Sequence, residues 1–224
     1  MPKRFHKELE KIKKKILSVG AMVEDRVHKA AKAITSCDSD LALQIKKADI
    51  EIDEAEVEVE EECLKVLALY QPVAGDLRFL TAVIKINNDL ERIADQAVNI
   101  AQRILTMTKQ KNSCNFYFDY SQMVDNVITM LKKSLDSLIN YDIDFAIEVC
   151  QMDDKVDHIK NEAYQSIKET MKNNPDEMEY LINLFLISRH LERMADHSTN
   201  IAEEVIYMIE GEIVRHGKKV LENG

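Results

Sequence analysis

The sequence predicts an all-α protein of six long helices, arranged as two tandem pseudo-repeated three-helix bundles. Its 224 residues include only five glycines and three prolines, too few for the many turns of a β-rich chain. Apolar residues recur at alternating spacings of three and four, and the period-two alternation of strands is missing. The segment NDLERIADQAVNIA at 88–101 returns as RHLERMADHSTNIA at 189–202 with eight of fourteen letters unchanged, which indicates an internal repeat.

The first repeat is expected to span residues 1–112 and to hold three helices. The first helix runs from about residue 3 to 34, with Gly20 as a point where it could bend. The N-cap cluster SCDSD at 36–40 starts the second helix, which continues to Tyr70. The segment QPVAGD then makes the turn into a third helix, from about 75 to 108.

The second repeat, residues 113–224, follows the polar segment KQKNSCNF at 109–116 and is expected to copy this order. Its helices run from about 117 to 140 and from about 142 to 172. The turn NNPDE leads into a last helix that continues past Glu210. Pro72 and Pro175 fall at comparable places in the two halves, so each half contains an α-hairpin and one further helix.

The third helix of each repeat carries the same apolar frame. Eight positions in the first repeat are expected to face the core: Val83, Ile86, Leu90, Ile93, Ala97, Ile100, Ile104 and Met107. Adding 101, the offset between Glu91 and Glu192, gives Leu184, Ile187, Leu191, Met194, Ser198, Ile201, Val205 and Met208. Only Ser198 interrupts the apolar pattern, so the repeat extends to the buried surface of each bundle.

Charge and composition exclude several classes of protein. The net charge of -10 argues against nucleic-acid binding, because neutralising phosphates requires a basic face. A run of lysines in the first helix could touch an anionic partner or membrane surface, but it is typical of a solvated helix face. The chain shows neither a signal peptide nor a membrane span, and its four cysteines have no C-x-x-C spacing. We therefore expect a cytoplasmic protein with reduced thiols.

The repeated segment places acids on an outward face of each third helix. Glu91, Asp95 and Asn99 are four residues apart, so they lie one above another along the helix. Glu192, Asp196 and Asn200 reproduce this line in the second repeat.

The preceding helices carry a second pair of acids in the same register. Asp49 and Asp53 flank the apolar seam of one helix, and Asp153 and Asp157 flank that of the other at an offset of 104. Flanking positions of an antiparallel hairpin can approach the neighbouring helix, so each half could gather four carboxylates on one surface.

Four converging carboxylates repel one another unless a cation neutralises them. Carboxylate and amide oxygens are hard ligands suited to magnesium, calcium, manganese or iron. The pattern therefore favours a metal-binding patch in each repeat, with a solvated acidic face as the alternative. His197 borders the second patch, either as an extra ligand or as an ordinary surface histidine. No ferritin-type Glu-x-x-His pair, phosphate-binding loop or nucleophile motif occurs, so an enzyme is not expected.

The segments QPVAGDLRF at 71–79, INNDLERIADQAVNIAQ at 86–102 and SRHLERMADHSTNIAEEVIYMIEGE at 188–212 resemble the signature segments of the PhoU family of phosphate-signalling proteins. The resemblance covers essentially the whole chain through the order and spacing of its helices. It implies two pseudo-repeated three-helix bundles and, in many members, a homodimer.

The resemblance also implies a function. Such proteins are cytoplasmic negative regulators of the phosphate-starvation response that act with a high-affinity phosphate ABC transporter, through its ATPase, and with a membrane sensor histidine kinase. The membrane would be reached only through these partners. Their acidic motifs are associated with metal sites, including multinuclear iron clusters, with manganese, magnesium, calcium or zinc as alternatives. The matching positions here are Asp49, Asp53, Glu91, Asp95, Asp153, Asp157, Glu192 and Asp196.

Two positions depart from the family pattern. Ala94 and Ala195 stand where glycine is frequent, which favours the helix by about 1 kcal/mol and leaves the oxygen ligands in place. Gln96 stands where histidine is common, whereas the second repeat keeps His197, so the two sites are not expected to be equivalent.

Three hypotheses follow. The first is a phosphate-signalling regulator whose acidic patches bind metal and whose helices dock on partners. The second is a metal-dependent phosphohydrolase, which would need a substrate pocket and a general base that the sequence does not offer. The third is a helical adaptor without metal, whose acids only steer basic partners.

Overall fold

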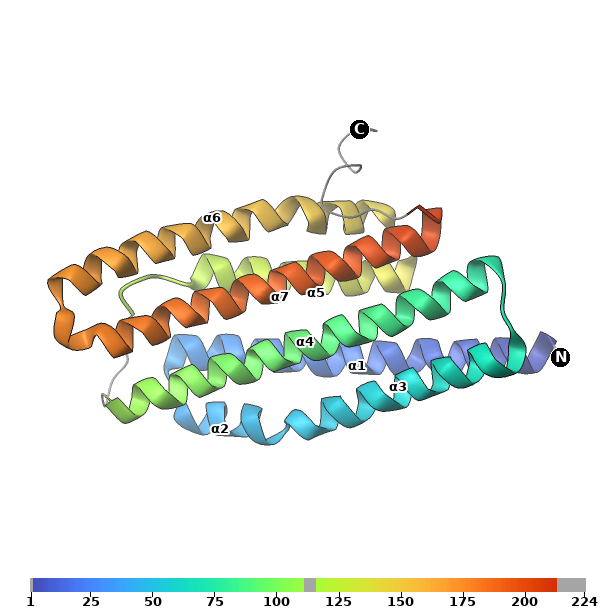
Figure 1. Ribbon diagram of the computed structural model, residues 1–224, viewed down its shortest axis with the longest axis horizontal. Helices are drawn as coiled ribbons and strands as arrows, with labels where there is room; N and C mark the ends of the chain where they lie inside the picture. Colours follow the sequence, from blue (N-terminus) through green and yellow to red (C-terminus); the bar gives the residue numbers. More distant parts are fainter. Residues whose placement is uncertain (1, 111–115, 213–224) are drawn as a thin grey trace.

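The computed structural model describes residues 2–110 and 116–212, and the described chain is helical with short connections (Figure 1). The expected all-α class is confirmed. The helices, in order along the chain, are α1 (Pro2–Ser36), α2 (Ser39–Lys47), α3 (Asp49–Tyr70), α4 (Ala74–Gln110), α5 (Ser121–Asn140), α6 (Ile143–Asn173), the 3-10 turn η1 (Pro175–Glu177) and α7 (Met178–Glu210).

The helices form two sets, each of which packs around its own long third helix. In the first set α1, α2 and α3 all contact α4, and in the second α5 and α6 contact α7. Helices α4 and α7 run antiparallel side by side through the middle of the molecule, and α1 contacts α5 (Figure 1). A single cluster of buried apolar residues extends through both sets. The proposed division at residue 112 falls outside the described residues and stays a prediction.

The apolar frame predicted for the two third helices is buried as expected. All eight positions from Val83 to Met107 have no exposed side-chain surface, and their counterparts from Leu184 to Met208 are 6% exposed or less. Ser198 is also fully buried, and its hydroxyl donates to the Met194 carbonyl oxygen at 2.9 Å. The hydroxyl that interrupts the apolar pattern is therefore hydrogen-bonded to the helix backbone, as a buried hydroxyl requires.

The expected second helix is divided into α2 and α3. The side chain of Asp38 caps α2 by accepting from the amides of Asp40 and Leu41. The guanidinium of Arg26, which is 5% exposed, donates to the carbonyl oxygens of Ile45 at 3.2 Å and Ala48 at 2.6 Å. These hydrogen bonds satisfy carbonyl oxygens at the C-terminal end of α2. The Arg26 side chain, which comes from α1, therefore stabilises the break between α2 and α3. A new helix then begins at Asp49.

Three further expectations are wrong. α1 is continuous through Gly20. A Cβ at this position would lie 2.8 Å from Leu135 Cδ2, so the missing side chain leaves room for α5 to pack against α1. α7 ends at Glu210, where Gly211 has a positive φ of 78°.

Cys37 is disulfide-bonded, so not every thiol is reduced. Cys63 and Cys150 are free, and burial raises the pKa of each to about 12. Cys114 lies outside the described residues.

Candidate functional site: two acid clusters

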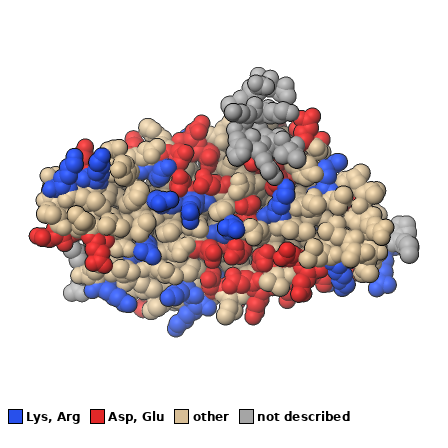
Figure 2. Space-filling model, viewed as in Figure 1, with Lys and Arg blue, Asp and Glu red and all other residues tan. Residues whose placement is uncertain are grey.

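The first acid cluster consists of Asp49 and Asp53 on α3 with Glu91 and Asp95 on α4. Burial raises the pKa of Asp49, and the charges of Asp53 and Asp95 raise it further. Burial also raises the pKa of Glu91 and of Asp95, with added repulsion from Asp53 in both cases. Acids of α3 therefore lie near enough to acids of α4 for their charges to interact, and Figure 2 shows acids gathered on this part of the surface.

Asp49 is the first residue of α3, directly after the break between α2 and α3. Its Oδ1 lies 3.8 Å from Arg26 Nη1, too far for a hydrogen bond. This oxygen is buried and has no hydrogen-bond partner. Since buried polar atoms are normally satisfied, Asp49 Oδ1 is an acceptor without a protein donor, at the edge of an acid cluster.

The second acid cluster consists of Asp153 and Asp157 on α6 with Glu192 and Asp196 on α7. Burial raises the pKa of Asp196 to about 6, with repulsion from Glu192, Asp153 and Asp157 adding to it. Burial likewise raises the pKa of Asp153, although Thr199 donates to its carboxylate at 3.3 Å. Acids of α6 and α7 therefore interact electrostatically, and their joint use as a ligand set stays a prediction.

The two clusters differ in the cation that each contains. Lys160 Nζ lies 3.1 Å from Glu192 Oε1 and 3.2 Å from Asp157 Oδ1, so an ammonium group bridges α6 and α7 inside the second cluster. The position equivalent to Lys160 in the first repeat is Glu56, whose carboxylate accepts from Asn87 Nδ2 at 3.2 Å. The charges of Glu60 and Asp53 add to the effect of burial in raising the pKa of Glu56. A cation therefore contacts two carboxylates of the second cluster directly, whereas in the first cluster Arg26 lies 3.8 Å from Asp49 and Glu56 adds a further acid.

The repeated segments also contact each other, which the sequence analysis did not anticipate. His197 Nδ1 lies 2.8 Å from Asp89 Oδ1, and His190 Nδ1 lies 2.9 Å from Gln96 Oε1. Gln96 lies seven residues after Asp89 on α4, and His190 lies seven residues before His197 on α7. The two contacts therefore follow each other along a pair of antiparallel helices. His197 is thus engaged in holding α7 to α4.

The two asparagines of the predicted ligand set lie differently. Asn200 Nδ2 donates to Asp89 Oδ1 at 3.1 Å, so this amide faces the contact between the repeats. Asn99 is half-buried on α4, one turn beyond Asp95. Their participation in metal binding stays a prediction.

The donor chemistry of the clusters fits a hard metal ion better in the first repeat than in the second. The first cluster offers four carboxylates and one unpartnered buried oxygen, whereas Lys160 already neutralises part of the second. Within residues 2–110 and 116–212, however, no three His, Cys, Asp or Glu side chains are arranged to hold one ion.

None of the helices within the described ranges is both long and apolar enough to cross a bilayer. Figure 2 shows the acids of the two repeats as separate groups, with lysine and arginine side chains between them.

Comparison with known proteins gives consistent matches across the chain. The family model described as the PhoU domain matches residues 16–104 and again residues 120–205. Phosphate-specific transport system accessory protein PhoU homologues of Pseudomonas putida and Pseudomonas aeruginosa are each 35% identical over 95% of this chain, which covers 83% and 88% of their lengths. The PhoU protein of Escherichia coli is 30% identical over 95% of this chain and 88% of its own length.

Solved structures agree. The crystal structure of PhoU from Pseudomonas aeruginosa is similar with a TM-score of 0.89 at 35% identity, covering 93% of this chain and all of that one. The phosphate transport system regulatory protein PhoU from Streptococcus pneumoniae has a TM-score of 0.83 at 28% identity, covering 95% of this chain and all of its own.

Proposed function

Because the chain belongs to the PhoU family, we propose that it is a cytoplasmic negative regulator of phosphate uptake and of the phosphate-starvation response. The observation that carries the proposal is the match of the family domain to both repeats, each with its acid motif. The relatives are named as accessory or regulatory proteins of phosphate transport, and those names favour regulation over catalysis.

The proposed mode of action is docking. The regulator contacts the ATPase of a phosphate ABC transporter and a membrane sensor histidine kinase, and it works as a homodimer. Its long helical faces provide the surface, and any contact with the membrane passes through these partners. No phosphate-cradling loop occurs in the sequence, so phosphate is sensed through the partners rather than by this chain.

We further propose that the acid clusters hold metal ions, with iron, manganese, magnesium, calcium or zinc as candidates. Asp49, Asp53, Glu91 and Asp95 would hold the ion of the first cluster, and Asp153, Asp157, Glu192 and Asp196 that of the second. A bound cation would remove the repulsion that raises the pKa values of these acids, and it would tie each third helix to the helix before it.

Deletion of the gene in its source organism tests the regulatory proposal. In phosphate-rich medium, the deletion should leave phosphate uptake and a starvation-gene reporter switched on, and the wild-type gene should restore both to their repressed level. Unchanged uptake and reporter activity in the deletion strain would contradict the proposal.

A further inference from the structure

Helix α3 is apolar on two opposite faces. Its inner face, formed by Ile52, Val59, Cys63 and Val66, is buried in the core. Its outer face carries Ile50, Val57 and Leu64, seven residues apart and 65%, 50% and 52% exposed. We name these three residues the outer stripe. Side chains seven apart lie on one side of a helix, so the three residues form one line along the outer face of α3.

The second repeat shows that this stripe is not required by the fold. At the offset of 104, the inner residues Ile52 and Val59 correspond to Val156 and Ala163, which are also buried and apolar. The outer stripe instead corresponds to Asp154, Asn161 and Lys168, all of them exposed. The two helices therefore share their buried face, and at these three solvent-facing positions α3 is apolar where α6 is polar.

Acids accompany the outer stripe along its length. Helix α3 contains nine acidic residues and a single lysine. Glu54 and Glu61 lie between the stripe residues along the same side, and Glu60 lies beside them. These three carboxylates are exposed and, within the described part of the chain, make no ion pair.

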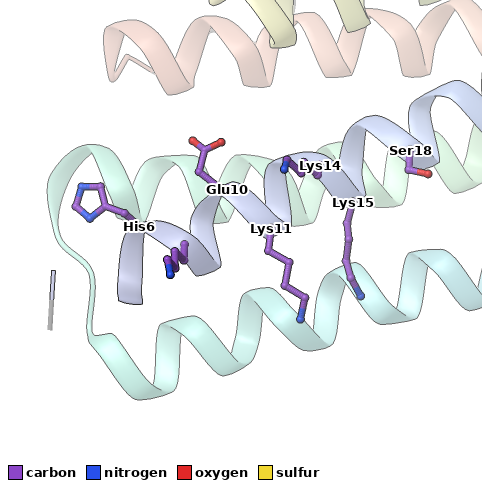
Figure 3. A pocket seen from close by; sticks show the side chains of 7 residues that line it. His6, Glu10, Lys11, Lys14, Lys15 and Ser18 are labelled. Carbon is purple, nitrogen blue, oxygen red and sulfur yellow. The ribbon is translucent and has the colours of Figure 1, made fainter. Parts of the chain in front are cut away.

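The acids on the side of α3 that faces α1 are already paired. Lys11 contacts Glu62 at 2.7 Å and Lys15 contacts Glu58 at 2.9 Å, and Figure 3 shows both lysines reaching from α1 toward α3. They line a shallow groove of about 580 Å³. The negative charge left for a partner therefore lies at and beyond the outer stripe, on the side away from α1.

This charge determines which occupant the outer stripe can take. Two copies of α3 placed face to face would bring like-charged rows together, which disfavours symmetric self-association through this face. An anionic surface is disfavoured for the same reason. A helix with apolar residues at alternating spacings of three and four, flanked by lysine or arginine, matches both the stripe and its acids.

We propose that the outer stripe of α3 is a docking face for a basic amphipathic helix of a partner protein. The apolar residues of the partner would cover Ile50, Val57 and Leu64, and its cations would pair with Glu54, Glu60 and Glu61. The inference shares with the proposed function only the idea that the protein acts by docking, and it requires no metal.

A synthetic peptide tests the docking face on metal-free full-length protein. The probe is a helical peptide of three heptads with leucine at the core positions and lysine at the flanking ones, and its binding is followed by fluorescence anisotropy. The triple variant Ile50→Asp, Val57→Asn, Leu64→Lys introduces the residues that α6 carries. We expect it to bind at least about tenfold more weakly than wild type. Matched changes at exposed apolar sites elsewhere, Ile139→Asp, Met178→Asn and Ile182→Lys, should leave binding unchanged.

Two further measurements separate the stripe from its charges. The variant Glu54→Lys, Glu61→Lys keeps the apolar stripe and should also weaken binding, and added salt should weaken the wild-type complex. A peptide with glutamate at the flanking positions should not bind. Equal binding by wild type and either variant, or by both peptides, would overturn the proposal.

A change of oligomeric state would overturn it as well. If light scattering shows a wild-type dimer that the triple variant abolishes, the face belongs to a second copy of this chain. Because the assay uses metal-free protein and a synthetic peptide, its failure leaves the phosphate and metal proposals standing.

Discussion

Single residues decide how the two acid clusters differ. Lys160 brings a positive charge between Asp157 and Glu192, whereas its counterpart Glu56 adds a negative charge beside the first cluster. The sequence contained this difference as one mismatch between repeats, but only the structure shows that the lysine reaches across to α7. The two sites share the same register, and they differ in where the side chains of Lys160 and Glu56 reach.

Replacing Asp196 with asparagine should stabilise the metal-free protein at pH 7. Burial and neighbouring acids raise the folded-state pKa of Asp196 from 3.8 to about 6, so the ionised form opposes folding. Because this carboxyl is only partly buried and water screens its charge, the gain in unfolding free energy should be about 1 kcal/mol or less. The gain should shrink as the pH falls through 6 and vanish below about 4, where the wild-type carboxyl is protonated in both states.

Urea unfolding of wild type and variant between pH 4 and 7, with a chelator present, measures this difference. Asp154→Asn is the matched control on an exposed neighbouring position, and it should change stability by less than about 0.5 kcal/mol. A variant that is less stable than wild type at pH 7 would contradict the account.

Among the elements, the break between α2 and α3 positions the first acid cluster. Arg26 binds the carbonyl oxygens of Ile45 and Ala48, and its guanidinium also faces Asp49. The predicted N-cap cluster and the end of α3 at Tyr70 were correct, and of the apolar seam expected along this helix Ile45, Ile52 and Val59 are buried. The break was missed because the apolar spacing runs through it unchanged, and its cause is a long-range contact from α1.

Replacing Arg26 with leucine should destabilise the protein by about 3 kcal/mol. The change leaves two carbonyl oxygens without their buried donor and Asp49 without its nearest cation. Thermal unfolding followed by circular dichroism measures the loss. Lys29→Leu, which removes a surface pair with Asp25, should cost less than about 1 kcal/mol. Equal effects of the two changes would contradict the role given to Arg26.

Gly20 makes a second prediction at this scale. A Cβ at Gly20 would lie 2.8 Å from Leu135 Cδ2, so Gly20→Leu should push α1 away from α5 and cost about 1–3 kcal/mol. Gly75 has no atom within 4 Å of such a Cβ, so Gly75→Ala serves as the control and should change stability by less than about 0.5 kcal/mol. Urea denaturation of both variants checks this, and a neutral Gly20→Leu would show that the helices do not meet there.

At the scale of the whole molecule, the duplication explains most of what the sequence predicted. The apolar frames of α4 and α7 correspond residue by residue, and both are buried. The acid pairs lie in the same register, and in both repeats the acids of the two helices interact electrostatically. What the repeat pattern could not predict is how the halves face each other. The offset of 101 relates Asp89 to His190 and Gln96 to His197, so the contacts of His197 with Asp89 and of His190 with Gln96 are counterparts, but the offset alone does not show that these side chains meet.

The central claim of this account is that the repeated acids are metal ligands. The most direct measurement is elemental analysis of protein purified without a metal-affinity tag. It is made beside a variant carrying Glu91→Gln, Asp95→Asn, Glu192→Gln and Asp196→Asn. A control carries the same number of changes at exposed acids outside the clusters: Glu10→Gln, Asp25→Asn, Glu169→Gln and Glu179→Gln. Circular dichroism establishes that each protein is folded.

We expect iron or another hard metal in the wild type and in the control, and none in the cluster variant. Lys160→Glu should raise the metal content, because it frees the second cluster from its resident cation. If the wild type holds no metal even after incubation with iron, manganese, magnesium, calcium and zinc, or if the cluster variant holds as much as the wild type, the acids are not ligands and the claim is contradicted.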